Sequence, residues 1–423
     1  MREKAVIVTV NFDSIRRDFE LSDLAAELEE LSNSAGLAIV KSLMVRQKNP
    51  NAALLIGSGK AQELADLVKK EKANVVVFES NLSSTQQRNL EEIIQVKTID
   101  RTQLILDIFA QRARSIEGRL QVELAQIQYL LPRLAGKGIY LSRLGGGVGT
   151  RGPGEQKLEM DRRRMRERIT RLERELGQVE KRRLANIQRK KEKNLPLITL
   201  VGYTNAGKSS LFNALTAASV TVKDKLFSTL DTTTRFLKLP GNQKALLADT
   251  VGFIRELPHS LIESFKASLE EAVHADVLLH VIDANRLDMG ALEKAVHRVL
   301  RDLGADKKKM LTVLNKIDLL SKNDREKIMN DPHGRNGVLV SSLTGEGLQN
   351  LTHRIADSVS DRILQKEFFI PKEKMGLLHF LYQEAEVLLR HDGAEGVVLK
   401  VNLSPKTEEL FKRKYEADGG AGL

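Results

Sequence analysis

Apolar positions in the first 113 residues follow two different periodicities. Short β-branched runs predict strands at 5–10, 37–45 and 74–80. Apolar residues spaced three and four apart predict helices at 21–35, 59–71 and 83–94. Strands that alternate with helices are typical of an α/β domain, so we expect one over residues 1–113.

The apolar spacing then changes to that of a coiled coil. The spacing alternates between four and three residues at Leu120, Leu124, Ile127, Leu131 and Leu134. It resumes at Leu158, Met165, Ile169, Leu172, Leu176 and Val179, where the first interval is a full heptad. Pro132 is expected to end or kink the first helix, because proline cannot continue a helix interior. Two such helices around a Gly-rich connector predict an antiparallel hairpin over 114–193, with the glycines at its tip.

A second α/β pattern begins at residue 194. Its apolar runs are continuous, as in parallel strands covered on both faces, and lie at 195–203, 245–250, 276–284, 310–318 and 337–342. Later runs predict a small βαβα domain, with elements at 368–371, 374–393, 396–404 and 405–415. We therefore expect an α/β fold class, with a mostly parallel sheet over 194–364 and a small C-terminal α/β domain over 365–423.

Composition narrows the class of protein. The chain is 41% hydrophobic and 29% charged, as in soluble globular proteins, and it lacks cysteine, which excludes disulfides and thiol chemistry. Its apolar runs are shorter than the ~18–20 residues of a membrane helix, and its first residues do not resemble a signal peptide. We expect a monomeric cytoplasmic protein without a membrane span.

Positive charge is concentrated in one segment. The net charge is +11, and residues 157–194 carry 15 Lys and Arg against 7 Asp and Glu, a net of +8. A local basic stripe favours a polyanionic partner. The alternative interpretation is a solvated helix face.

A phosphate-binding motif follows the predicted strand at 195–203. The pattern G-x-x-x-x-G-K-S opens a helix there, as a P-loop does. The residues expected around the nucleotide are Gly202, Tyr203, Thr204, Asn205, Ala206, Gly207, Lys208, Ser209 and Ser210. Lys208 is expected to reach the β- and γ-phosphates as a catalytic residue, and Ser209 to bind Mg²⁺.

The next segment of a nucleotide switch ends the strand at 245–250. It reads Asp249, Thr250, Val251 and Gly252. Asp249 is expected to hold Mg²⁺ through water, and the Gly252 N–H to sense the γ-phosphate as part of catalysis.

Two further segments predict guanine as the base. The first contains Asn315, Lys316 and Asp318, and the second contains Ser341, Ser342 and Leu343. The Asp318 carboxylate can accept two N–H bonds from guanine, whereas adenine lacks the matching donors. We expect Asn315 to brace the base, Lys316 to pack on its plane, and the second segment to offer a backbone N–H to the guanine oxygen.

A switch loop also requires a threonine that closes on Mg²⁺ and the γ-phosphate. The candidate stretch, expected to lie at the nucleotide, begins Phe227, Ser228, Thr229, Leu230. We choose Thr229 for the catalytic and Mg²⁺-binding role. Thr232, Thr233 and Thr234 remain alternatives.

Phe253 stands where many small GTPases have a water-orienting glutamine. Because phenylalanine cannot hydrogen-bond water, we expect a GTPase that is slow alone. Asn205 occupies the loop position that binds K⁺ in some GTPases, so K⁺ stimulation is a hypothesis. Its alternative is that Asn205 only shapes the loop.

Two other glycine stretches resemble nucleotide loops. Gly57-Ser58-Gly59-Lys60 lacks the first glycine of a P-loop and is interpreted as a turn that starts a helix. Residues 147–152 match G-x-G-x-x-G, but a dinucleotide loop requires a strand before the glycines and a helix directly after them. We expect no strand, because the stretch at 137–144 is too short and charged, and no helix, because Pro153-Gly154 should interrupt the chain where that helix would begin. We predict RNA contact instead, through Gly149, Thr150, Arg151 and Gly152, with a flexible hinge as the alternative.

The chain resembles the HflX GTPases over nearly its whole length. The most specific matches are the stretches at 145–163 and 249–271, supported by 100–126, 201–215 and 227–235. Two departures are a lysine at 157 in the Gly-rich stretch and the lack of a proline after Asp231.

The resemblance implies an N-terminal α/β domain, a helical hairpin, a P-loop GTPase domain and a small C-terminal domain. It also implies GTP-dependent binding to the large ribosomal subunit and its ribosomal RNA, with ribosome splitting under stress and hydrolysis stimulated by ribosomes. One alternative is an RNA-remodelling NTPase whose N-terminal domain uses ATP. Another is a nucleotide-gated scaffold in which hydrolysis is incidental.

Overall fold

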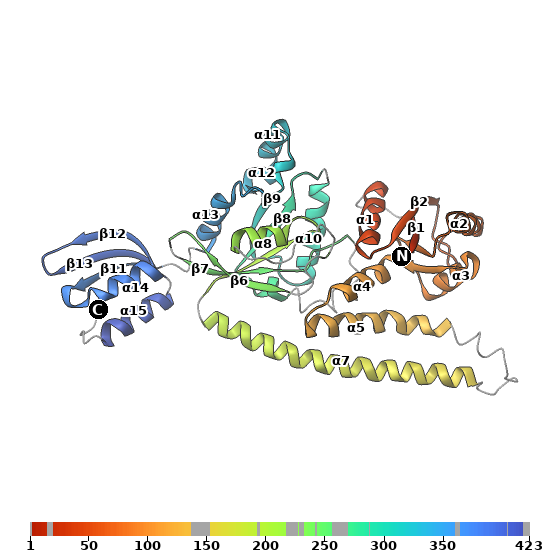
Figure 1. The fold of residues 1–423 in the computed structure, drawn as a ribbon, viewed down its shortest axis with the longest axis horizontal. Coiled ribbons are helices and arrows are strands. Elements are labelled where there is room, and N and C mark those ends of the chain that lie inside the picture. Colours follow the sequence, from red (N-terminus) through yellow and green to blue (C-terminus); the bar gives the residue numbers. More distant parts are fainter. Residues whose placement is uncertain are drawn as a thin grey trace. The chain divides into compact units, whose positions relative to one another are not determined.

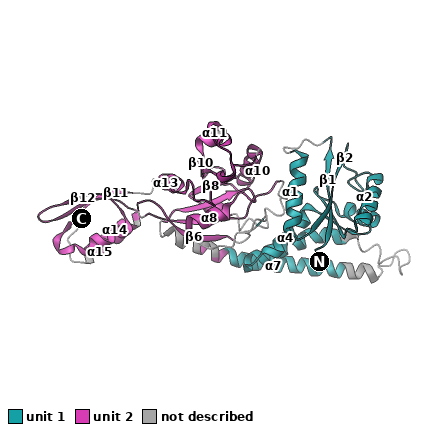
Figure 2. Ribbon diagram, turned by 45° about the horizontal axis from the view of Figure 1, so that its top comes forward, with its two compact units in different colours: residues 1–180, 224–231, 256–266 teal, residues 181–223, 232–255, 267–423 magenta. Residues whose placement is uncertain are grey.

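The fold is shown as a computed structural model in Figure 1. The structure describes residues 2–14, 20–136, 153–192, 195–216, 227, 232–241, 243–255, 270–286, 288–359, 364–403 and 405–417. Two compact units are coloured in Figure 2: unit 1 contains 1–180, 224–231 and 256–266, and unit 2 contains 181–223, 232–255 and 267–423. The finer division into four domains stays a prediction.

A four-stranded parallel sheet forms the centre of unit 1, in the order β2-β1-β3-β4. Its strands are β1 (Lys4–Phe12), β2 (Ala38–Gln47), β3 (Val75–Phe78) and β4 (Lys97–Asp100). The connecting helices are α1 (Leu21–Ser34), α2 (Ser58–Glu71) and α3 (Ser84–Ile94), and α4 (Arg101–Arg112) follows β4. Strand β4 was not predicted, because its four residues, KTID, are too few to show a strand pattern.

The Gly57–Lys60 stretch begins a helix, as predicted. Gly57 is the residue before α2, which starts at Ser58. The Lys60 ammonium lies 2.6 Å from the Glu63 carboxylate one turn later on the same helix. Lys60 therefore belongs to a helical ion pair.

The coiled-coil spacing forms a helical hairpin, as predicted. Figure 1 shows α5 (Ile116–Leu130) and α7 (Pro153–Glu192) side by side and antiparallel. The Arg168 guanidinium of α7 donates two hydrogen bonds, of 2.7 and 2.8 Å, to the Glu123 carboxylate of α5. Pro132 has the predicted effect, because α5 ends at Leu130 and the chain continues as a 3-10 helix, η1 (Leu131–Gly136).

One expectation about the glycine stretch was wrong. Pro153 and Gly154 do not interrupt the chain after the glycines, because α7 begins at Pro153 itself. Proline suits the first position of a helix, since its fixed φ is helical and the N–H it lacks would have no partner within the helix. Residues 137–152, including the predicted RNA-contact residues, lie outside the described part of the chain.

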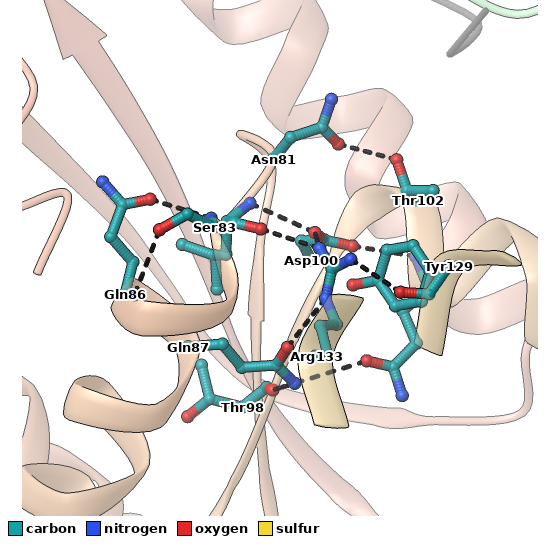
Figure 3. Close-up of polar contacts among 11 residues, drawn as sticks. Asn81, Ser83, Gln86, Gln87, Thr98, Asp100, Thr102, Tyr129 and Arg133 are labelled. Atoms are coloured by element: carbon teal, nitrogen blue, oxygen red, sulfur yellow. Dashed lines mark hydrogen bonds and ion pairs between the residues drawn. The ribbon is translucent and has the colours of Figure 1, made fainter. Parts of the chain in front are cut away.

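Arg133 attaches η1 to the carboxyl end of the unit 1 sheet (Figure 3). Its guanidinium donates to the Leu82 carbonyl at 2.7 Å and to the Asp100 carboxylate at 3.2 Å, and it lies 3.4 Å above the Tyr129 ring. Its Nε donates to the Gln87 side chain at 3.2 Å. Asp100 is fully buried as the last residue of β4, so Arg133 supplies the cation that a buried carboxylate requires. Burial, and then the Asp100 charge, raise the pKa of Tyr129, which keeps this phenol neutral.

Unit 2 is built on a six-stranded sheet in the order β10-β9-β8-β5-β7-β6. Its strands are β5 (Leu197–Gly202), β6 (Thr233–Lys238), β7 (Lys244–Asp249), β8 (Val277–Asp283), β9 (Lys309–Asn315) and β10 (Val338–Leu339). All neighbours are parallel except β6 and β7. This is the mostly parallel sheet that the sequence predicts, except that β6, which contains Thr233 and Thr234, was not expected as a strand.

Helices cover both faces of this sheet, which explains its continuous apolar strands. On one face, Leu211 and Phe212 of α8 (Lys208–Thr216) and Leu351 and Ile355 of α13 (Leu348–Val359) join the core. On the other face, α10 (Met289–Asp302) packs through Val296, Val299 and Leu300. The shorter helices η2 (Ile317–Leu319), α11 (Lys322–Asn330) and α12 (Pro332–Asn336) follow β9.

The C-terminal part of unit 2 is an antiparallel sheet with two helices. Its strands, in the order β11-β13-β12, are β11 (Leu364–Pro371), β12 (Glu386–Asp392) and β13 (Gly396–Leu403). Its helices are α14 (Gly376–Glu384) and α15 (Pro405–Ala417), with the short η4 (Lys372–Lys374) between β11 and α14. The predicted βαβα pattern missed one strand, because the run at 374–393 divides at Ala385 into α14 and β12.

Among the described residues, the helices are too short or too polar to cross a membrane.

We predict that Arg133→Ala destabilises unit 1 by about 2–3 kcal/mol. Loss of a buried ion-pair partner typically costs ~3–5 kcal/mol, and the estimate is lower here because 18% of the Arg133 side chain is exposed. Hydrogen exchange of β4 and α3 amides in the full chain measures the effect. Arg119→Ala, at an exposed position of α5, is the control. Unchanged protection in Arg133→Ala would contradict the role of this residue.

Candidate nucleotide-binding site

The predicted phosphate loop connects β5 to α8 in a conformation that requires glycine. Gly202 has φ +148°, and a Cβ there would lie 2.2 Å from the Val281 carbonyl oxygen of β8. Gly207 has φ +88°, and a Cβ there would lie 2.2 Å from the Asn315 amide nitrogen. Asn205 adopts the left-handed region at φ 61°, which asparagine tolerates better than most residues. The two motif glycines therefore permit contact with two neighbouring strand ends.

Lys208 is buried at the point where the phosphate loop ends and α8 begins. Its ammonium donates to the carbonyl oxygens of Gly202 at 3.0 Å and Tyr203 at 2.8 Å. Burial lowers the pKa of Lys208 to about 8, and the Asp249 carboxylate acts in the opposite direction. A buried ammonium with this depressed pKa would be stabilised by the negative charge of a phosphate.

Ser209 and Asp249 bring two hard oxygen donors together. The Ser209 hydroxyl donates to Asp249 Oδ2 at 2.7 Å, and both residues are buried. Ser209 lies in the first turn of α8, and Asp249 is the last residue of β7. Mg²⁺ prefers hydroxyl, carboxylate and water oxygens, so this donor set fits the ion.

Gly252 approaches the phosphate loop closely. A Cβ at this position would lie 2.8 Å from the Lys208 ammonium and 2.8 Å from the Thr204 methyl group. The preceding Thr250 is also fixed, because its hydroxyl donates to the Leu200 carbonyl at 2.7 Å. The segment after β7 therefore lies beside the loop, as the predicted order of motifs requires.

Phe253 pairs its backbone with the phosphate loop and turns its ring into the core. Its N–H donates to the Gly202 carbonyl at 3.1 Å, and its carbonyl accepts from the Thr204 N–H at 2.7 Å. The ring is 2% exposed and packs in the cluster that contains Val201 and Val296. A side chain in this position cannot orient water at a phosphate.

Asn315 links the two ends of the predicted site. Its side-chain amide donates to the Ala206 carbonyl at 3.0 Å, and its side-chain oxygen accepts from the Ser342 N–H at 3.0 Å. The residue is fully buried at the end of β9. One side chain thus joins the phosphate loop to the segment that contains Ser341, Ser342 and Leu343.

Asp318 is positioned by that same segment. Its carboxylate accepts a hydrogen bond of 2.5 Å from the Ser341 hydroxyl, which itself accepts from the Thr344 N–H. Lys316 adopts φ 65°, and its ammonium lies 2.8 Å from the Asp283 carboxylate at the end of β8. The carboxylate that is predicted to bind guanine is therefore held by a hydroxyl, and the neighbouring lysine by an ion pair.

A buried arginine, which the sequence did not predict, lies beside this site. Arg255 is fully buried, its backbone N–H donates to the Tyr203 hydroxyl at 2.7 Å, and its guanidinium pairs with Asp288. Burial acts to raise the pKa of Asp288, but the Arg286 hydrogen bond and the Arg255 charge hold that pKa below its usual value. An arginine two residues after Phe253 gives no sequence signal of burial, because arginine is usually exposed.

Of the predicted switch residues 227–230, only Phe227 is described. Ser228, Thr229 and Leu230 are not among the described residues. Phe227 is described and buried, and its ring packs edge-on against Phe109 of α4 with centroids 4.6 Å apart. The structure therefore brings together the P-loop, the segment 249–252 and the guanine-site segments, all in unit 2.

Comparison with known protein families covers most of the chain. In order, the matches are a GTP-binding GTPase N-terminal region at 22–110, a GTP-binding GTPase middle region at 112–191, a 50S ribosome-binding GTPase at 197–316, and an HflX C-terminal domain at 328–418.

Full-length relatives agree with these matches. The chain is 44% identical over 412 residues to the GTPase HflX of Caldanaerobacter subterraneus subsp. tengcongensis, covering 97% of this chain and 93% of that protein. It is 42% identical over 381 residues to the GTPase HflX of Escherichia coli, covering 90% and 88%. A solved GTP-binding protein from Sulfolobus solfataricus in complex with GDP is 24% identical, with a TM-score of 0.45, over 85% of this chain and 99% of that one. Because identity above 40% extends over nine tenths of the sequence, the chain belongs to the HflX family of GTPases.

Proposed function

We propose that this GTPase binds the large ribosomal subunit in its GTP state, splits or rescues ribosomes under stress, and is released after hydrolysis. The observation that carries the proposal is the row of exposed guanidinium groups on α7, in a chain with a GTPase domain of a ribosome-binding family. Among them, Arg163 and Arg164 have side chains 80% and 72% exposed. Ribosomal RNA is the polyanion that such a helix fits.

Not all of this charge is available to RNA without rearrangement. Arg163 pairs with Glu167 at 2.9 Å, and Arg171 pairs with Glu175 at 2.8 Å, each one turn apart on the exposed helix. Exposed pairs of this kind are weak, because water and salt screen them, so phosphates can displace the carboxylates. We propose that α7 and the connector residues Gly149, Thr150, Arg151 and Gly152 together contact RNA.

Within the GTPase site, we propose that Lys208 leaves the loop carbonyls and reaches the β- and γ-phosphates. In this structure the Gly202 and Tyr203 carbonyls accept hydrogen bonds from its ammonium. Ser209, Asp249 and Thr229 would hold Mg²⁺, which neutralises phosphate charge when bound. Gly252, next to Lys208, would sense the γ-phosphate through its N–H.

Hydrolysis by the chain alone is proposed to be slow. The buried Phe253 ring cannot orient a water molecule, so another group must do so. A ribosomal contact that reorders the switch segments would supply the missing group, which accounts for stimulation by ribosomes.

The ATP-dependent alternative receives no support from the unit 1 sheet. Ligands of open α/β sheets bind outside the carboxyl ends of the strands. The space beside β3 and β4 is filled by Arg133, held by Leu82, Asp100 and Gln87 (Figure 3). The Gly57–Lys60 stretch, which resembles the end of a phosphate loop, begins α2, and Lys60 there pairs with Glu63.

The guanine preference can be tested at Asp318. Asp318→Asn should weaken GTP binding by about 100-fold or more, because one of the two acceptor oxygens becomes an NH₂ donor that faces an N–H donor of guanine. The same variant should gain affinity for XTP, in which a carbonyl replaces the 2-amino group of guanine. Nucleotide titration measures both affinities, with Asp302→Asn on an exposed part of α10 as control. Equal GTP affinity in Asp318→Asn and wild type would remove this residue from the base site.

Dependence on K⁺ can be tested at Asn205. Its exposed side chain lies in the phosphate loop, where a monovalent cation could contact the nucleotide. Hydrolysis should be severalfold faster in K⁺ than in Na⁺ at equal ionic strength, and Asn205→Ala should abolish the difference while Asn330→Ala retains it. Equal rates in the two salts would end this hypothesis.

Sedimentation of intact ribosomes tests the proposed function. With GTP or a non-hydrolysable analogue, the protein should co-sediment with large subunits and convert intact ribosomes to subunits, whereas GDP should not support this. Binding should weaken as salt rises, because phosphate contacts release counterions. Arg151→Ala should reduce ribosome binding and leave GTP affinity unchanged. The control Arg390→Ala, on the C-terminal sheet, should change neither ribosome binding nor GTP affinity. GTP hydrolysis that is unaffected by added large subunits would count against the proposal.

A further inference from the structure

Three potential metal ligands converge between β8 and α10. They are His280 of β8 and Glu293 and His297 of α10, and their ligand atoms all lie within 4.8 Å of one another. The His297 Nε2 is 3.8 Å from a Glu293 carboxylate oxygen. The imidazole rings of His280 and His297 meet edge to face, with centroids 5.9 Å apart.

The strand places His280 where an apolar residue would be expected. Alternate residues of a strand share a face, so His280 lies on the same face as Leu278, which packs with Val296 and Val299 of α10. His280 is 1% exposed within the run VLLHVID. Burying an imidazole on a strand face that a helix covers is unfavourable in free energy unless its ring nitrogens are bound by a polar or metal partner.

The helix contributes its two ligands with matching spacing. Glu293 and His297 are four residues apart, so they lie on the same face of α10, one turn apart. Their side chains are 22% and 38% exposed, whereas His280 is buried. The cluster therefore has one fixed ligand and two that can adjust their rotamers.

The distances allow a tetrahedral ion after a small closure. Ligand nitrogens bound at ~2.0–2.1 Å lie roughly 3.3 Å from one another around a tetrahedral centre. The present separations are no greater than 4.8 Å, and rotation of the partly exposed Glu293 and His297 side chains can close the difference. Two imidazoles and one carboxylate suit Zn²⁺ and similar borderline ions, whereas Mg²⁺ prefers oxygen ligands throughout.

The cluster adjoins a cavity at the phosphate loop. Glu293 and His280 line this cavity, together with Tyr203, Thr204, Asn205 and Ala206. A fourth coordination position directed at the cavity could be filled by water. The site would then connect α10, β8 and the phosphate loop.

We propose that His280, Glu293 and His297 form a binding site for a divalent transition-metal ion of the Zn²⁺ class. Its ligands and its position differ from those of the proposed Mg²⁺ site at Ser209 and Asp249. An ion bound to both β8 and α10 stabilises the folded GTPase core, because the unfolded chain does not bring these ligands together.

Zn²⁺ titration of the full-length protein, without nucleotide and in excess Mg²⁺, tests the proposal. One Zn²⁺ should bind per chain and raise the thermal unfolding midpoint. Co²⁺ in place of Zn²⁺ should give the intense visible absorption of a low-symmetry, nitrogen-ligated site. This spectrum is measured on the wild-type chain and does not depend on a variant that folds.

Glu293→Gln and His297→Asn should each weaken Zn²⁺ binding about 10-fold or more and reduce the Co²⁺ spectrum. Both positions are partly exposed, which favours folding of the variants. His353→Asn, at an exposed histidine of α13, is the matched control and should bind as wild type does. Binding that is unchanged in both cluster variants, or an adventitious ion only, without a defined stoichiometry or a Co²⁺ spectrum, would overturn the proposal.

Discussion

The backbone pairing between the phosphate loop and Phe253 is the contact on which the nucleotide site depends. Two hydrogen bonds, from the Thr204 N–H to the Phe253 carbonyl and from the Phe253 N–H to the Gly202 carbonyl, join the segment after β7 to the loop after β5. They hold Gly252 so close to Lys208 that a side chain at 252 would overlap the ammonium. If Lys208 binds phosphate as predicted, the segment 249–252 lies close enough to respond to it.

Hydrogen bonds and ion pairs of buried polar side chains connect the Phe253 pairing to the rest of the site. Asn315 hydrogen-bonds the Ala206 carbonyl and the Ser342 N–H, which connects the phosphate loop to the segment predicted to bind guanine, where Ser341 positions Asp318. Arg255 extends the connection to the start of α10 through Asp288. Because unsatisfied buried polar groups are costly, these hydrogen bonds restrict the loops to a small set of arrangements.

A buried charge plays the corresponding part in unit 1. Asp100 ends a short buried strand and needs a cation, which Arg133 provides from η1, directly after α5. The first helix of the hairpin is thereby attached to the sheet by charge as well as by apolar packing. The heptad spacing of apolar residues does not specify how the hairpin meets the sheet. The ion pair between Arg133 and Asp100 specifies one point of contact.

Much of the site was predictable because its chemistry depends on local order along the chain. Glycine spacing, a lysine and a serine at the start of a helix define a phosphate loop wherever they follow a strand. The roles of Asp249, Asp318 and Thr229 at the nucleotide remain predictions, and Thr229 lies outside the described residues. Where sequence patterns failed, the elements were short or atypical: β4 has four residues, β12 was merged with α14, and Pro153 begins a helix that it was expected to interrupt.

The sequence by itself determined the family, the order of the nucleotide motifs, the coiled-coil hairpin and the location of the basic stripe, since each depends on residue type and spacing. Tertiary structure alone decided which distant residues meet: Arg133 with Asp100, Arg255 with Asp288, Asn315 with Ala206, and His280 with α10. The reason is physical, because a single chain pattern shows which residues prefer burial but not which partner satisfies a buried charge or imidazole. That choice is made by packing between elements far apart in the sequence.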